Sequence, residues 1–118
     1  MADEFTHLKV TETDSVHVVE FSERKILEEF SIAEIGEELA RIAGKAEGVK
    51  ILVSFKDVEH LSSAALGMLI TLNKKVGEQN GKLKLSDISP QIYEVFKITR
   101  LNKLFDIYDT AQAALKSF

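Results

Sequence analysis

Residues 49–78 constrain the fold most, because they place a short apolar strand directly before an amphipathic helix. The strand segment, ValLysIleLeuValSerPhe at 49–55, is rich in β-branched and apolar side chains, which is typical of a strand buried on both faces. After a brief turn, apolar side chains recur with a helical period at Ala65, Leu66, Leu69, Ile70, Leu72 and Val76. A buried strand that leads into a core helix is the building unit of an α/β protein.

Ser62 and Ser63 stand at the junction between this strand and this helix. A serine at that place can cap the helix, because its hydroxyl oxygen accepts a hydrogen bond from an unpaired amide of the first turn. The same place also suits a phosphate, since free N–H groups and the helix dipole both attract an anion. Capping is the commoner role of such a pair, and the alternative is a phosphorylation site at Ser63 or, less favoured, at Ser62.

The remaining elements follow from alternation and capping patterns. Alternating residues predict strands at 5–11 and 15–21, joined by a turn at 11–15, and the exposed connection that follows has a short strand or turn at 26–27. Ser31 with Glu34 predicts the start of a helix that runs to Ala43. Alternation predicts a strand at 82–88, and a short apolar run predicts another at 104–107. Between them, Ser89 and Pro90 predict the start of a third helix that ends at about 99–102 and turns Ile92, Val95 and Phe96 inward. Asp109 with Gln112 predicts the cap of a last helix.

This order of elements predicts the fold class. Strands alternate with helices through short connections, which indicates an α/β layer fold with a mostly parallel sheet of four to five strands, an antiparallel edge hairpin and about four helices. A chain of 118 residues fits one domain.

Composition excludes several kinds of site. The chain has no cysteine, which excludes disulfide bonds and thiolate zinc sites. His7, His17 and His60 are too scattered to indicate a metal cluster, and the glycines form no phosphate-binding loop, so we expect no metal and no cofactor. The net charge of -4 argues against nucleic-acid binding. The acidic start and the lack of a long apolar run predict a cytoplasmic protein without membrane insertion.

A more specific indication comes from residues 51–70, IleLeuValSerPheLysAspValGluHisLeuSerSerAlaAlaLeuGlyMetLeuIle. Together with the order of the elements, this segment resembles the STAS domain of bacterial anti-sigma factor antagonists. That family carries an apolar strand, an Asp, and a loop of the form Asp-Ser-Ser/Thr-Gly-Leu-Gly, to which Asp57, Ser63, Leu66 and Gly67 correspond. The resemblance covers nearly the whole chain and predicts a single STAS-like domain over residues 1–118.

The resemblance implies a regulatory binding protein and no enzyme. Family members bind a cytoplasmic anti-sigma factor serine kinase with a histidine-kinase-like ATPase fold, and in doing so free the sigma factor. Phosphorylation of a serine or threonine in this loop reverses the exchange of partners, and a phosphatase is a further expected partner. We expect the protein to be a monomer or a weak dimer.

The loop also departs from the family pattern. Aligned without gaps, Ser62 takes the place of the Asp, Ala64 that of the usual phosphate acceptor, and Ala65 that of the glycine. Either Ser63 or Ser62 has taken over as the acceptor, or the protein binds its partner constitutively. In the second case it is a scaffold or a subunit of a larger signalling or lipid-transport assembly.

We expect the partner to contact the surface around this loop, formed by Asp57, Glu59, His60, Ser62, Ser63 and Met68. A third, less favoured hypothesis is a small serine hydrolase in which His60 activates Ser63. Acyl transfer would also require an orienting third group and an oxyanion hole, and the sequence identifies neither.

Overall fold

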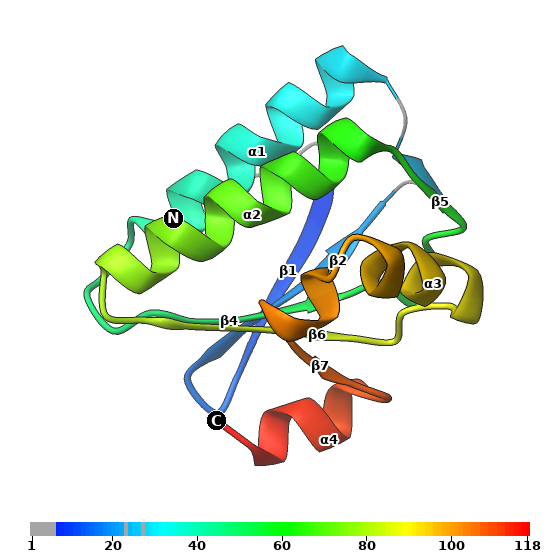
Figure 1. Cartoon of the computed structure of the whole chain (residues 1–118). Helices are drawn as coiled ribbons and strands as arrows, with labels where there is room; N and C mark the ends of the chain where they lie inside the picture. Colours follow the sequence, from blue (N-terminus) through cyan, green and yellow to red (C-terminus); the bar gives the residue numbers. More distant parts are fainter. Residues whose placement is uncertain (1–6, 23, 27) are drawn as a thin grey trace.

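The computed structural model describes residues 7–22, 24–26 and 28–118, and it has the α/β architecture that the sequence predicts (Figure 1). One five-stranded sheet has the strand order β1-β2-β4-β6-β7. Its strands are β1 (Leu8–Thr13), β2 (Val16–Phe21), β4 (Lys50–Ser54), β6 (Lys82–Ser86) and β7 (Asp106–Tyr108). Strands β1 and β2 pair antiparallel as an edge hairpin, and all other neighbouring strands pair parallel.

The helices cover the two faces of the sheet unequally (Figure 1). Helices α1 (Glu29–Ala43), α2 (Ser63–Glu78) and α3 (Pro90–Ile98) contribute to one large core on the same face. The short helix α4 (Ala111–Lys116) lies on the opposite face, where a smaller apolar cluster surrounds Leu52 and Ala114. Helices α1 and α2 run side by side, with their first turns at the same end.

The central strand β4 explains why the apolar run at 49–55 controls the fold. Ile51, Leu52 and Val53 are all fully buried, as expected for a strand with helices on both sides. Beyond the strand, Phe55 contacts the rings of Phe21 and Phe96, with centroid separations of 5.3 and 6.5 Å. These aromatic pairs join β2, the end of β4 and α3 within one core.

The hairpin differs from the prediction in the position of its turn. Strand β1 continues to Thr13, and the turn consists only of Asp14 and Ser15, whose φ angles are 51° and 69°. Two consecutive left-handed residues suit a tight hairpin turn, so the predicted turn at 11–15 was too wide. The first predicted residues of this strand, Phe5 and Thr6, lie outside the described residues.

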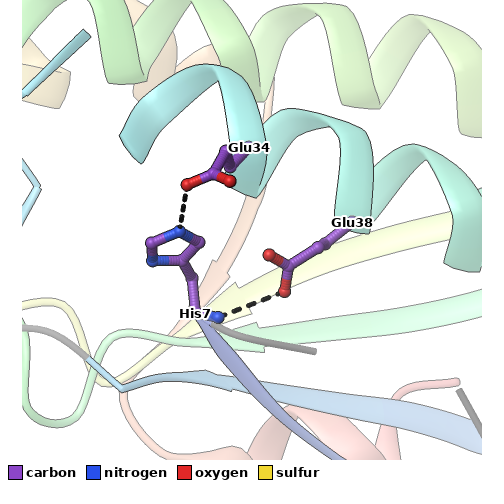
Figure 2. Close-up of polar contacts among 3 residues, drawn as sticks. All are labelled: His7, Glu34 and Glu38. Atoms are coloured by element: carbon purple, nitrogen blue, oxygen red, sulfur yellow. Dashed lines mark hydrogen bonds and ion pairs between the residues drawn. The ribbon is translucent and has the colours of Figure 1, made fainter. Parts of the chain in front are cut away.

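Helix α1 does not begin with the predicted capping box. It starts at Glu29, and Ser31 lies inside its first turn. The predicted partner of that cap, Glu34, instead accepts a hydrogen bond from His7 Nε2 at 2.9 Å, while the backbone N–H of His7 donates to Glu38 (Figure 2). A long-range contact to the residue before β1 therefore replaces the local cap.

The C-terminal third shows two further differences. A 3₁₀ turn, η1 (Leu101–Lys103), follows α3, so the last strand begins at Asp106 and not at 104. Helix α4 is capped by Thr110, whose hydroxyl accepts from the backbone N–H of Ala113 at 3.1 Å, and the predicted cap at Asp109 is wrong. Two predicted core residues, Ile70 and Val95, are 41% and 38% exposed.

Candidate protein-binding site

The loop between β4 and α2 is held by a small second sheet, of which the sequence predicted only the short strand or turn near Ile26. Strand β5 (His60–Leu61) pairs parallel with β3 (Lys25–Ile26). The backbone N–H groups of Glu59 and Ser62 donate to the carbonyls of Arg24 and Ile26 at 2.7 and 3.0 Å. A two-residue strand has no detectable periodicity, and only its partner segment makes it a strand. The loop that carries the candidate residues is therefore anchored before the helix begins.

Ser62 and Ser63 have different environments. Ser62 is the N-cap of α2, and its hydroxyl oxygen accepts from the backbone N–H of Ala65 at 3.2 Å. Ser62 is half-buried, whereas Ser63, the first residue of the helix, is exposed. The predicted capping role is thus confirmed for Ser62, and the exposed hydroxyl beside the positive end of the helix dipole belongs to Ser63.

Three of the predicted binding residues, Asp57, Glu59 and His60, line one cavity, which we call the polar pocket. The polar pocket has a volume of about 350 Å³, and its other lining residues are Arg24, Lys56, Val58, Ser89 and Gln91. It lies at the carboxyl ends of parallel strands β4 and β6, where α/β proteins commonly bind ligands. Arg24 and Gln91 were not predicted for this site, because only the folded sheet brings their segments beside it, whereas Lys56 adjoins the predicted Asp57 in the chain.

The charges around the polar pocket are mixed and exposed. The guanidinium of Arg24 lies 3.9 Å from a carboxylate oxygen of Glu59, with side-chain exposures of 77% and 57%. An ion pair this exposed contributes little to stability, so both groups can exchange partners at low cost. This favours a surface that recognises polar groups of another molecule.

Met68 lies outside the polar pocket and lines a second cavity between α1 and α2, which we call the apolar groove. The apolar groove also measures about 350 Å³ and is lined mainly by small and apolar residues, among them Ala33, Gly36, Ala40, Ala64 and Leu72. Ser62 and Ser63 belong to the lining of neither cavity, although they lie between His60 and Ala64 in the chain. The predicted surface therefore divides into a polar part and an apolar part.

A cluster of polar side chains fixes the neighbouring loop after β6. The hydroxyls of Ser54 and Ser86 both donate to one carboxylate oxygen of Asp87, at 3.1 and 2.7 Å. Asp87 has a φ of 59°, a left-handed conformation that is uncommon outside glycine. These bonds join the ends of β4 and β6 and hold the β6–α3 loop, which supplies Ser89 to the polar pocket.

Other kinds of site find no support in the described part of the chain. No group of three or more potential metal ligands occurs among the described residues. Within the same residues, no hydrogen bond joins Ser63 to His60, the pair that the hydrolase hypothesis requires. Nor does any described helix have the length and apolar character needed to cross a membrane.

The fold and this loop identify the family. The STAS domain family profile matches residues 7–114, so the chain belongs to the STAS domain family. Its fold is that of the anti-sigma factor antagonists: an antagonist (STAS) domain protein from Planctomyces limnophilus superposes with a TM-score of 0.83 at 24% identity, covering 93% of this chain and 96% of that chain. SpoIIAA, a Bacillus cell fate determinant solved in its phosphorylated form, superposes with a TM-score of 0.68 at 15% identity, covering 93% and 97%.

Sequence similarity leads to the same group of proteins. The chain is 34% identical over 61 residues to the anti-sigma-B factor antagonist of Bacillus subtilis. The matched region is 52% of this chain and 56% of that protein, so the chain spans little more than half the length of this relative. The predicted family and fold class are therefore confirmed.

Proposed function

We propose that this protein is a regulatory binding module that occupies an anti-sigma factor serine kinase of the histidine-kinase-like ATPase fold in a cytoplasmic partner-switching pathway. The observation that carries the proposal is an exposed serine, Ser63, at the first position of α2 and next to an anchored polar loop. Membership of the STAS family and similarity to the anti-sigma-B factor antagonist of Bacillus subtilis support it. The proposed docking surface comprises Asp57, Glu59, His60, Ser62, Ser63 and Met68.

Ser63 is the preferred phosphate acceptor within this surface. Its hydroxyl is exposed, while the hydroxyl oxygen of Ser62 accepts the capping hydrogen bond of α2. Phosphate adds about -1.5 to -2 units of charge at neutral pH, and the start of a helix tolerates this charge. The same charge would clash with a partner docked over Ser63 and this loop, which provides the switch. The phosphorylated SpoIIAA structure is a precedent on this fold.

The experiment combines the purified protein with ATP and a serine kinase of this fold encoded beside its gene. We expect intact-protein mass spectrometry to show one added phosphate, which Ser63→Ala abolishes and Ser62→Ala retains. Calorimetric titration should show micromolar or tighter binding of the unphosphorylated protein and a large loss after phosphorylation. Absence of both binding and phosphate would refute the proposal, and phosphate retained in Ser63→Ala would move the acceptor to Ser62.

The two serine variants need a stability control. Ser62→Ala removes the cap of α2 and should lower the free energy of unfolding by about 1 kcal/mol, whereas Ser63→Ala should change it little. Thermal unfolding of both variants checks that each is folded before its phosphorylation is compared. The kinase would transfer the γ-phosphoryl group of ATP to the serine hydroxyl and release ADP, and a phosphatase would restore the binding form by hydrolysis, so the module itself needs no catalytic activity.

A second candidate function is constitutive binding within a larger assembly, as a scaffold or as a subunit of a signalling or lipid-transport complex. The specific observation that favours it is Ala64, which lacks a hydroxyl and lines the apolar groove. A constitutive module should bind its kinase equally with and without ATP, and it should elute in a large particle during size-exclusion chromatography. The regulatory module should instead elute alone as a monomer or weak dimer.

A further inference from the structure

The apolar groove owes its shape to small residues on both of its walls. A Cβ atom built on Gly36 of α1 would lie only 3.3 Å from Cγ of Met68 on α2, so the two helices approach closely there. Ala33 and Ala64 keep the groove open toward the first turns of both helices. The groove therefore begins beside Ser63 and runs along the two parallel helices.

The α1 side of the groove carries unpaired negative charge around an exposed aromatic ring. Glu28, Glu29 and Glu37 are exposed, and none of them forms an ion pair among the described residues. Phe30, which is 75% exposed, lies three residues before Ala33 and seven before Glu37, on the same face of α1. Lys75 of α2 also lines the groove, so the negative charge lies on its α1 side.

We propose that the apolar groove is a docking site for a basic amphipathic helix of the partner protein. Apolar side chains spaced along one face of such a helix would fill the groove, in the helix-in-groove mode of recognition. Lysine or arginine residues on its flank would face Glu28, Glu29 and Glu37, which supplies the charge complementarity. This inference rests on the proposed function, because it specifies which feature of the partner the module recognises.

Position 64 controls access to this groove. The methyl group of Ala64 lines the cavity, whereas the neighbouring Ser63 does not. A charge placed at 64 would have to lose its hydration when the groove is filled, and an uncompensated buried charge is strongly unfavourable. The same charge at 63 would remain in water. Residues 63 and 64 are therefore expected to affect binding in separable ways.

The test uses the full chain and a synthetic helix of about 18 residues as the probe, with leucines at helical spacing and lysines at the remaining positions. A second peptide carries glutamates in place of the lysines. In NMR titrations of the isotope-labelled protein, the lysine peptide should shift the amides of Ala33, Gly36, Ala64 and Met68. We expect the glutamate peptide to bind at least about tenfold more weakly.

Ala64→Glu and Ser63→Glu form a matched pair, since each adds one carboxylate to the first turn of α2, where an acidic residue favours the helix. We expect Ala64→Glu to weaken binding of the lysine peptide at least about tenfold, because its charge is desolvated, whereas Ser63→Glu should leave the affinity within about threefold or raise it. Glu29→Lys should reduce binding of the lysine peptide more than Glu12→Lys does. Glu12 is exposed on β1, so its replacement is a control that changes the net charge equally. Equal effects within either pair would overturn the proposal.

Two other results separate this inference from its alternatives. A concentration-dependent dimer that Ala64→Glu converts to a monomer would mean that a second copy of the chain fills the groove, and would overturn the basic-helix proposal. If the kinase binds normally to Ala64→Glu and is released by phosphorylation at Ser63, the groove proposal fails and the proposed function stands. If the lysine peptide binds as expected but no kinase does, the proposed function fails alone.

Discussion

The two faces of the sheet differ in how they are covered, and the difference explains where the candidate site lies. On one face, α1, α2 and α3 enclose a core that extends from Leu8 to Phe105. On the other face, one six-residue helix covers a cluster whose fully enclosed members are Val16, Leu52 and Ala114. The loop of the candidate site and the apolar groove both belong to the first face. A surface that must present fixed groups to a partner benefits from such a rigid support.

The second face contains Lys84, the one buried lysine among the described residues. The ammonium group of Lys84 donates to the Tyr108 hydroxyl and to the carbonyl oxygen of Ser117, at 3.2 and 3.3 Å. It also lies 5.1 and 5.2 Å from the ring centroids of Tyr108 and Phe118. Polar contacts and cation–π contacts thus hold the C-terminal segment, where apolar area is small.

The largest expected effect comes from truncating two neighbouring residues of β4 that point to opposite faces. Ile51 and Leu52 are both fully buried, Ile51 in the large core and Leu52 beneath α4. We expect Ile51→Ala to lower the free energy of unfolding by about 4 kcal/mol and Leu52→Ala by about 2–3 kcal/mol, because a short helix can settle into the space. Urea denaturation measures both values. An equal or reversed order would mean that the two faces are packed alike.

A smaller effect is expected for Lys84→Met, which keeps the length of the side chain and removes its charge. Loss of the hydrogen bonds to Tyr108 and Ser117 should destabilise the protein by about 1–2 kcal/mol. Native-state hydrogen exchange should show that protection falls mainly in α4, while the amides of α2 respond less. If α2 loses protection to the same degree, Lys84 supports the whole domain and not its second face alone.

The smallest effect is spectroscopic. The hydrogen bond with the Ser117 side chain and, after it, the contact with Lys84 lower the pKa of Tyr108 from its usual value. In alkaline titrations followed by phenolate absorbance in the Tyr93→Phe background, Tyr108 should ionise below the pH of an unperturbed tyrosine. Ser117→Ala and Lys84→Met should each raise the pKa of Tyr108. An unchanged titration in both variants would show that these contacts do not persist in solution.

Local signals in the sequence identified the elements that depend on short-range chemistry. The period of residues 65–76 predicted α2, and the serines at 62 and 89 cap α2 and α3 as expected. Asn80, directly after α2, has a φ of 58°, a left-handed conformation that asparagine adopts more often than most residues. In each case, the residues that determine the local conformation lie within a few positions of one another in the chain.

The wrong or missed predictions instead concern residues whose partners lie far away in the chain. Glu34 was predicted to take part in a local cap at Ser31, but its carboxylate contacts His7, which lies 27 positions away. Strand β5 was missed because it exists only by pairing with β3. The candidate site was half predicted for the same reason: Asp57, Glu59 and His60 are contiguous, while Arg24 and Gln91 reach the polar pocket from other segments.

The sequence by itself determined the α/β class, the central strand, the cap at Ser62 and the family, because periodicity, capping and a contiguous loop are all local properties. The tertiary structure alone decided that Ser63 is exposed and that Ala64 and Met68 share a groove with α1. It also separated that groove from the polar pocket. The physical reason is that a surface is formed by packing, which joins residues far apart in the chain and divides residues that are neighbours in it.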